Sequence, residues 1–173
     1  MTSPARKTSN TLFTGPPGCG KSTLIRTIAQ GLKKPMTGFY TSEIREKGAR
    51  VGFAITTMDG REGILAHIRI EGPISVGRYG VNIEDINRVA VPSMLPSDPD
   101  EIVVIDEIGK MECLSPLFKK ALLDALNAPN QVIGSICLKG DRFIQRIQGR
   151  NDVSLILVTR ENRNGLPAAF FRG

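Results

Sequence analysis

The spacing of apolar residues along the chain predicts an alternation of strands and helices. Short apolar runs typical of strands are followed by segments in which apolar residues return every three or four positions, as on the buried face of a helix. The predicted strands cover residues 11–14, 37–41, 51–57, 64–70, 102–105, 132–138 and 155–158. The predicted helices cover residues 22–32, 83–91, 116–126 and 142–147. Segments 72–80 and 92–99 are rich in glycine and proline and are predicted to be loops.

This order of elements indicates a three-layer α/β fold, with helices on both faces of a mainly parallel central sheet. The aliphatic run at 102–105 is typical of a parallel strand that is buried on both faces. Segments 51–57 and 64–70 are separated by Asp59-Gly60, which predicts an antiparallel hairpin insertion at about residues 45–70. A chain of 173 residues with 40% hydrophobic residues is expected to form a single domain over residues 1–173.

Composition argues against several classes of protein. The longest apolar runs are only a few residues, so no membrane span and no secretory segment is predicted, and we expect the protein in the cytoplasm. Cys19, Cys113 and Cys137 lack the paired spacing of a zinc or redox motif and are interpreted as reduced thiols. His67 is the single histidine, which leaves little support for a histidine metal centre or a Ser-His-Asp triad.

The net charge of +6 is distributed unevenly, with positive charge at both ends of the chain. Residues 1–34 hold six bases and no acid, residues 139–173 hold seven bases and three acids, and residues 35–138 carry a net charge of −4. The two basic ends could meet in space as a surface for an anion, either nucleic acid or polyphosphate. A basic surface that is only solvated explains the charge equally well.

The most specific motif lies between the predicted strand 11–14 and the predicted helix 22–32, where it matches the phosphate-binding pattern G-x-x-x-x-G-K-[ST]. Glycines let the backbone N–H groups face phosphate oxygens, and the helix N-terminus adds a positive partial charge. Lys21 is expected to reach the β and γ phosphates, and Ser22 is expected to bind Mg²⁺. The predicted nucleotide-binding residues are Gly15, Pro16, Pro17, Gly18, Cys19, Gly20, Lys21, Ser22 and Thr23.

Two adjacent acids, Asp106 and Glu107, follow the predicted strand 102–105. Ligands of open α/β sheets bind at this edge, so we expect Asp106 to hold Mg²⁺ together with Ser22. Glu107 is expected to polarise the attacking water, which favours hydrolysis over phosphoryl transfer to another acceptor.

Transition-state charge on the γ phosphate normally needs a cation besides Lys21 and Mg²⁺. The sequence offers several candidates, none of which it singles out, and each is interpreted first as a solvated surface residue. They are Lys110, Arg142, Arg146, Arg160 and Arg163.

Several segments together resemble the small nucleoside-triphosphatase family, which includes thermophile enzymes and the vertebrate cancer-related nucleoside-triphosphatase. The resemblance runs from about Leu12 to Arg163 and rests on segments 15–23, 38–45, 52–53, 79–81, 104–112 and 159–163. It implies a P-loop fold near the RecA-like branch and slow, Mg²⁺-dependent hydrolysis of ATP, GTP and other nucleoside triphosphates with broad base specificity.

The sequence departs from that family at two places. Cys19 stands where valine is frequent, which should leave the backbone of the loop intact. The chain ends at Gly173, earlier than is usual in the family, which leaves open whether Phe170 and Phe171 pack internally or against another subunit.

The leading hypothesis is a cytoplasmic nucleoside-triphosphatase, monomeric or weakly self-associating, with Mg²⁺ as cofactor. A second hypothesis is a P-loop kinase, with residues 79–88 or 142–150 in the acceptor site or lid. A third is an ATP-regulated nucleic-acid-binding protein. It is disfavoured because aromatic residues make up only 5% of the chain and do not alternate with basic residues.

Overall fold

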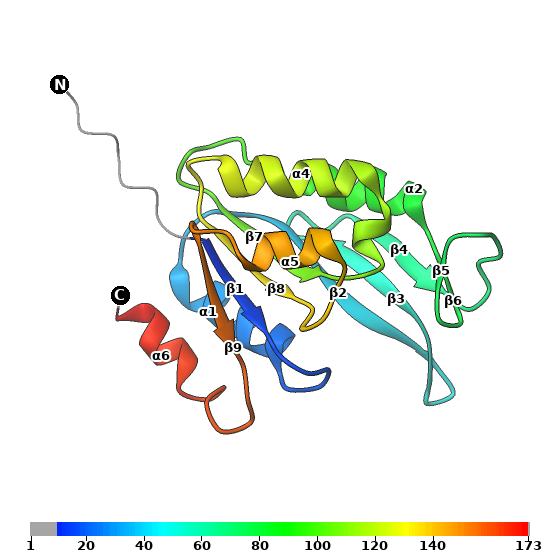
Figure 1. The fold of residues 1–173 in the computed structure, drawn as a ribbon, viewed down its shortest axis with the longest axis horizontal. Coiled ribbons are helices and arrows are strands. Elements are labelled where there is room, and N and C mark those ends of the chain that lie inside the picture. The colour runs from blue at the N-terminus through cyan, green and yellow to red at the C-terminus, as the bar shows by residue number, and fades with distance from the viewer. Residues whose placement is uncertain (1–9, 173) are drawn as a thin grey trace.

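The computed structural model describes residues 10–172, which form one sheet covered by helices on both faces (Figure 1). Within these residues the sheet has nine strands in the order β5-β6-β4-β3-β2-β7-β8-β1-β9. The α/β class with a mainly parallel centre, predicted from the sequence, is confirmed. None of the helices in residues 10–172 is long and apolar enough to cross a membrane.

The parallel half of the sheet contains five strands. They are β1 (Asn10–Thr14), β2 (Met36–Glu46), β7 (Ile102–Ile108), β8 (Val132–Ile136) and β9 (Val153–Leu157). Strand β8 separates β1, which leads into the glycine-rich loop, from β7, which carries Asp106 and Glu107. Strand β7 is longer than predicted, so both acids lie within the strand instead of after it.

The antiparallel half continues the same sheet from β2. It contains β3 (Ala49–Thr57), β4 (Glu62–His67), β6 (Tyr79–Val81) and β5 (Ser75–Val76). The predicted hairpin is confirmed as β3 and β4, but β2 extends it into a three-stranded unit by pairing antiparallel with β3. The prediction of a loop over 72–80 is wrong at β5 and β6, which are too short to show a two-residue period.

Alternate residues of the central strands face two separate apolar layers. In β7, Val103 and Ile105 face one layer, whereas Ile102 and Val104 face the other. The first layer is covered by α4 (Pro116–Asn127) and α5 (Arg142–Gln148), and the second by α1 (Lys21–Leu32) and α6 (Leu166–Phe171). Because every residue of β8 is buried, this strand lies at the centre of the core.

The remaining helical segments lie between β6 and α4. Three short segments, α2 (Ile83–Asp85), the π-helical η1 (Ile86–Ala90) and α3 (Val91–Ser93), follow one another where one helix over 83–91 was predicted. A short 3₁₀ segment, η2 (Glu112–Leu114), precedes α4. The helix α6 was not predicted. Its Phe170 packs against the second apolar layer, and the ring of Phe171, although 46% exposed, lies over Gly31 of α1.

Candidate functional site

The predicted phosphate-binding loop joins β1 to α1 in a conformation that requires glycine at its start. Gly15 has φ of +154°, and a Cβ there would lie 2.6 Å from the carbonyl oxygen of Val158 and 2.9 Å from Cys19 Sγ. Gly20 caps α1, and the first turn of that helix contains no acidic residue and no side-chain cap. The backbone N–H groups of this turn are therefore free to face an anion.

Lys21 is the first residue of α1, and its side chain folds back across the loop. The Nζ donates hydrogen bonds to the carbonyl oxygens of Gly15, at 3.0 Å, and Pro16, at 3.4 Å. The residue is only 9% exposed, so its charge is held beside the loop instead of in solvent. An ammonium group in this place can interact with phosphate groups bound to the loop.

Asp106 is fully buried in β7, next to the loop. Ser135 of β8 donates a hydrogen bond from Oγ to Asp106 Oδ1 at 2.6 Å, whereas Oδ2 has no hydrogen-bond partner within residues 10–172. Burial raises the pKa of Asp106, while the hydroxyl groups of Ser135 and Ser22 and the charges of Arg26 and Lys21 oppose this increase. The other residues of β8 are aliphatic or glycine, so Ser135 is a polar residue in a buried strand. This signal is present in the sequence, but sequence reasoning gave Ser135 no role.

The same carboxylate fits a divalent cation. A buried carboxylate oxygen without a partner, with the Ser22 hydroxyl close by, provides the hard oxygen ligands that Mg²⁺ prefers. Within the described part of the chain, no group of three His, Cys, Asp or Glu side chains could hold a metal ion by itself. A cation here would therefore depend on ligands from phosphate and water as well, as Mg²⁺ sites commonly do.

Glu107 is half-buried in the next position of β7, and a second glutamate lies beside it. A Cβ placed on Gly109 would lie 2.9 Å from Glu107 Oε1 and 2.8 Å from Glu112 Oε2, so both carboxyl groups pack over the same glycine. Burial raises the pKa of Glu107, and the positive charge of Lys21 opposes this increase. Glu112 is 4% exposed, and burial together with Glu107 raises its pKa to about 8. Sequence reasoning gave Glu112 no role.

Two clefts meet at the loop. One, of about 440 Å³, has loop residues and the first turn of α1 on one side and residues of β2 and β3 on the other, with Glu107 also bordering it. The other, of about 470 Å³, lies between α1 and the segment that contains Arg163, Asn164 and Pro167. The loop therefore lies between two clefts, and only the 440 Å³ cleft is bordered by Glu107.

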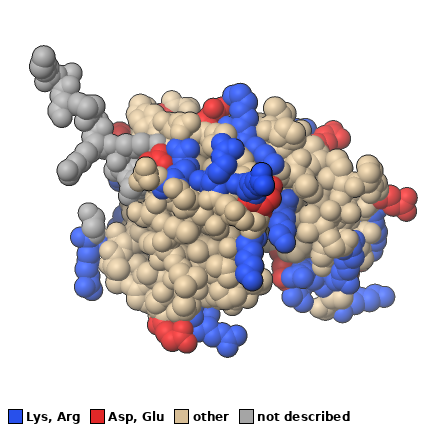
Figure 2. Space-filling view, in the orientation of Figure 1, with Lys and Arg blue, Asp and Glu red and all other residues tan. Residues whose placement is uncertain are grey.

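The candidate cations occupy different places around these clefts. Lys110 borders, with Glu107 and Lys21, a further hollow of about 350 Å³. Arg163 lies on the other side of the loop, where its Nη1 donates a hydrogen bond of 3.4 Å to the carbonyl oxygen of Cys19. Arg160 is exposed, and Arg142 and Arg146 belong to α5. In the view of Figure 2, basic side chains gather over α5. The basic residues Arg6 and Lys7 of the N-terminal end lie outside the described residues.

Comparisons with known proteins point to one family. A family model described as NTPase matches residues 10–170. The nucleoside-triphosphatase THEP1 of Thermotoga maritima is 40% identical over 156 residues, which cover 90% of this chain and 89% of that protein. The cancer-related nucleoside-triphosphatase of Homo sapiens is 38% identical over 171 residues, with 89% and 90% covered.

Two solved structures share the fold. The crystal structure of THEP1 from the hyperthermophile Aquifex aeolicus matches with a TM-score of 0.83 at 31% identity, covering 92% of this chain and 96% of that one. The solution structure of a human cancer-related nucleoside triphosphatase matches with a TM-score of 0.81 at 36% identity, covering 95% and 96%. Both are similar over nearly the whole chain.

Proposed function

The chain belongs to the NTPase family, and from that premise we propose that it hydrolyses nucleoside triphosphates to diphosphate and phosphate in the cleft that holds Lys21 and Glu107. One observation carries the assignment of the site. The phosphate-binding loop, the buried carboxylate of Asp106 and the half-buried Glu107 come together at one end of the parallel strands.

Binding is assigned to the loop residues Gly15–Thr23. The N–H groups at the start of α1 and the charge of Lys21 would hold the β and γ phosphates. Lys21 would then exchange its two carbonyl contacts for phosphate oxygens, a change that leaves its buried charge neutralised. Neither of these contacts reads a base, which agrees with hydrolysis of several nucleoside triphosphates.

Mg²⁺ is proposed as the cofactor, with Ser22 and Asp106 as its protein ligands. The unpartnered Oδ2 of Asp106 supports this assignment, because a buried carboxylate oxygen without a partner is costly. When bound, the cation would neutralise charge on the phosphate oxygens. Ser135 would hold the Asp106 carboxylate in place through its bond to Oδ1.

Glu107 is proposed to orient the attacking water and accept its proton. A bond forms between the water oxygen and the γ phosphorus, the bond from that phosphorus to the bridging oxygen breaks, and the nucleoside diphosphate leaves. The raised pKa of Glu107 makes its carboxylate a stronger base than an exposed glutamate. The positive charge of Lys21 opposes this increase.

The test of this proposal is phosphate release from ATP, GTP and CTP with Mg²⁺. We expect Lys21→Ala to lower kcat/KM by at least about a hundredfold, because it removes a charge that contacts the phosphates. Glu107→Gln should bind nucleotide as the unmodified protein does but turn over about a hundredfold or more slowly. If either variant turns over at the unmodified rate, that residue does not have the proposed role.

A third variant tests the metal assignment. Asp106→Asn keeps the shape of the side chain but weakens its affinity for a cation, so turnover should require a much higher Mg²⁺ concentration. Ser135→Ala is the matched comparison, since it removes only the hydrogen bond to Oδ1 and should shift the Mg²⁺ dependence less. Equal Mg²⁺ dependence in Asp106→Asn and the unmodified protein would contradict the assignment.

Three further expectations complete the proposal. We expect one catalytic domain, supported by the single sheet that all described strands share. We expect a monomer or weak homo-oligomer in the cytoplasm, which sedimentation and fractionation would test.

The comparisons offer no support for a kinase, and activity that is independent of added RNA or DNA would argue against a nucleic-acid-dependent function.

A further inference from the structure

We infer that Arg50 is the cation that faces the γ phosphate from the wall of the cleft opposite Lys21, and that it stabilises the charge of the transition state. This inference rests on the proposed function and adds a residue to it. Arg50 is the second residue of β3 and borders the 440 Å³ cleft that also contains Lys21, Ser22 and Glu107. No sequence motif points to it.

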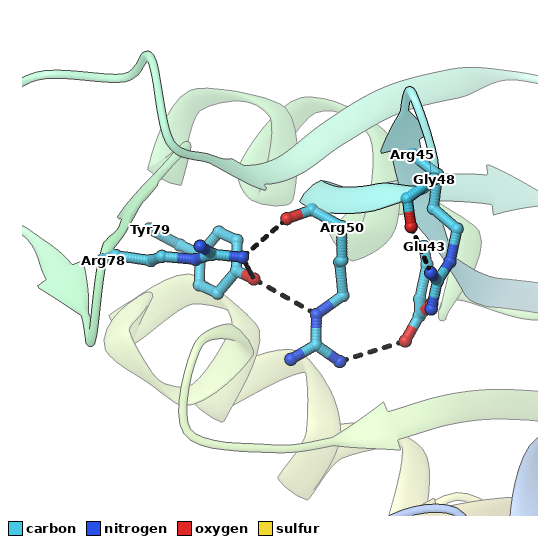
Figure 3. Close-up of polar contacts among 6 residues, drawn as sticks. All are labelled: Glu43, Arg45, Gly48, Arg50, Arg78 and Tyr79. Carbon is cyan, nitrogen blue, oxygen red and sulfur yellow. Dashed lines mark hydrogen bonds and ion pairs between the residues drawn. The ribbon is translucent and has the colours of Figure 1, made fainter.

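The side chain of Arg50 is held in place by two hydrogen bonds. Its Nε donates to the hydroxyl oxygen of Tyr79 at 3.1 Å, and its Nη1 donates to Glu43 Oε1 at 3.0 Å. The guanidinium also lies over the ring of Phe53, at 5.2 Å from the centroid. Figure 3 shows the guanidinium between Tyr79 on one side and Glu43 on the other. Three strands, β2, β3 and β6, therefore fix one arginine.

Two of its partners are themselves fixed by other arginines. Arg45 donates from Nη2 to Glu43 Oε2 at 2.6 Å, and Arg78 donates from Nη2 to the Tyr79 hydroxyl at 3.2 Å (Figure 3). Arg78 also donates to the carbonyl oxygen of Arg50 at 2.7 Å. This network already restricts the Arg50 side chain before a ligand binds. Less conformational entropy is therefore lost on binding.

These contacts leave Arg50 able to bind an anion. Within residues 10–172 no hydrogen bond is made by its Nη2, and the side chain is 44% exposed where it borders the cleft. Glu43 is shared with Arg45, so the cluster of Glu43, Arg45 and Arg50 keeps a net positive charge. The hydrogen bonds to Tyr79 and Glu43 raise the pKa of Arg50, and a guanidinium is charged at neutral pH in any case.

The other cations are less well placed for this role. Arg163 bonds to the carbonyl oxygen of Cys19 and borders the cleft that does not contain Glu107. Lys110 shares a hollow with Lys21 and Glu107 but does not border the 440 Å³ cleft. Arg50 alone among the described arginines borders the same cleft as both Lys21 and Glu107.

The chemistry explains what Arg50 would contribute. As the bond to the leaving oxygen breaks, negative charge spreads over the γ phosphate oxygens and the bridging oxygen. Ser22 and Asp106 would hold Mg²⁺ near these oxygens, Lys21 would contact them from the loop, and Arg50 would face them from the side of β3. An arginine that acts mainly in the transition state raises kcat and changes KM little.

The experiment compares Arg50→Ala with Arg61→Ala in steady-state hydrolysis of ATP. Arg61 is a matched control because it lies in the same antiparallel half, pairs with Asp59 and has a side chain 46% exposed, but borders neither cleft at the loop. We expect Arg50→Ala to lower kcat by about a hundredfold or more while KM changes less than about threefold. Arg61→Ala should keep the unmodified kcat and KM.

A binding measurement separates this role from a structural one. The probe is ADP with Mg²⁺, measured with and without aluminium fluoride, which completes a mimic of the transferring phosphoryl group. Arg50→Ala should bind ADP as the unmodified protein does. The increase in affinity that aluminium fluoride produces should be at least about tenfold smaller in Arg50→Ala than in the unmodified protein. Thermal unfolding of Arg50→Ala and Arg61→Ala is measured alongside binding, and normal ADP binding by Arg50→Ala shows that the cleft is still folded although its contacts with Tyr79 and Glu43 are lost.

The outcomes separate the inference from the proposed function. If Lys21→Ala is inactive and Arg50→Ala has the unmodified kcat, the inference about Arg50 is wrong and the proposed function stands. If Lys21→Ala is fully active, the proposed function itself is wrong. If Lys110→Ala loses the aluminium fluoride enhancement and Arg50→Ala keeps it, Lys110 is the cation and the inference is overturned.

Discussion

Glu112 is a carboxyl group that the fold holds almost entirely out of water. It is 4% exposed in η2, and the neighbouring charge of Glu107 adds to the effect of burial, so its pKa is raised to about 8. Its carboxyl group packs over Gly109 together with that of Glu107. At neutral pH the folded protein therefore keeps a proton on Glu112, which limits the negative charge beside the proposed water site.

The first prediction follows from that proton. An unfolded chain releases the Glu112 proton near the ordinary pKa of 4.5, whereas the folded protein holds it until about pH 8. Between these values the folded state binds more protons, so the free energy of unfolding falls as pH rises, by roughly 1.4 kcal/mol per pH unit from this group. In Glu112→Gln this contribution is absent, so urea unfolding at pH 5, 6, 7 and 8 should show a flatter dependence.

The matched control for Glu112→Gln is Glu62→Gln. It makes the same substitution at an exposed position in β4 and should leave the pH dependence of unfolding unchanged. If the curves of Glu112→Gln and the unmodified protein run parallel from pH 5 to pH 8, the folded protein does not retain the Glu112 proton.

The roles of site residues that lie in contiguous motifs can be predicted from the sequence. The roles of residues that meet only because their strands are neighbours in the sheet cannot. Lys21 and Asp106 are recognisable because a loop pattern and an aliphatic strand mark them locally. Arg50 meets Tyr79 from 29 positions away, and Ser135 meets Asp106 from 29 positions away. Those pairs depend on strand order, which single-residue patterns do not reveal.

At the scale of elements, β2 is the strand that joins the two halves of the sheet. It pairs parallel with β7 along one edge and antiparallel with β3 along the other. Gly38 lies where β2 contacts β7, with φ of +112°, and a Cβ there would lie 1.9 Å from the carbonyl oxygen of Val104. The close packing of β2 against β7, the strand that carries Asp106 and Glu107, therefore depends on a glycine at this position. Because β3 pairs with the other edge of β2, the position of β3 depends on the same glycine.

The second prediction is that Gly38→Ala lowers the free energy of unfolding by at least about 3 kcal/mol. The added methyl group meets backbone, which cannot move without separating two central strands, and the positive φ adds strain. Gly48→Ala is the control, because Gly48 also has a positive φ, of +80°, but no atom lies within 4 Å of its Cβ position. That variant should lose only about 1 kcal/mol.

Chemical denaturation of both glycine variants measures the difference. Equal losses in Gly38→Ala and Gly48→Ala would mean that backbone strain alone decides the cost and that β2 and β7 can separate to accept a methyl group.

The elements that sequence patterns missed share a physical cause. Strands β5 and β6 have two and three residues, too few to establish an alternating pattern. The helix α6 spans six residues, and its contacts with α1 form only in the folded chain. By contrast, α1 and α4 each have twelve residues with a clear apolar face, so the predicted and observed bounds agree within one residue.

For the molecule as a whole, the proposed nucleotide cleft lies between the two halves of the sheet. The loop and α1 belong to the parallel half, whereas the opposite wall, which carries Glu43, Arg50 and Phe53, includes β3 of the antiparallel half. A ligand that contacts both walls stabilises the arrangement of the entire sheet, because the unfolded chain has no such cleft to bind it.

The third prediction is therefore a large effect of nucleotide on thermal unfolding. A nonhydrolysable ATP analogue with Mg²⁺, at about one hundred times its Kd, should add about 2.7 kcal/mol to the free energy of unfolding. For a chain of this length that corresponds to an increase in Tm of roughly 5–10 °C. Removing Mg²⁺ with a chelator should reverse most of the increase, since the proposed site holds the cation through Ser22, Asp106 and the phosphates.

Two variants show which parts of the cleft produce this stabilisation. Lys21→Ala removes the buried ammonium that would contact the phosphates and should abolish the increase in Tm. Arg61→Ala, which changes an exposed arginine away from the cleft, should retain all of it. An equal increase in Lys21→Ala would place the nucleotide elsewhere on the basic surface, because a ligand stabilises the folded protein only through the contacts that it makes there.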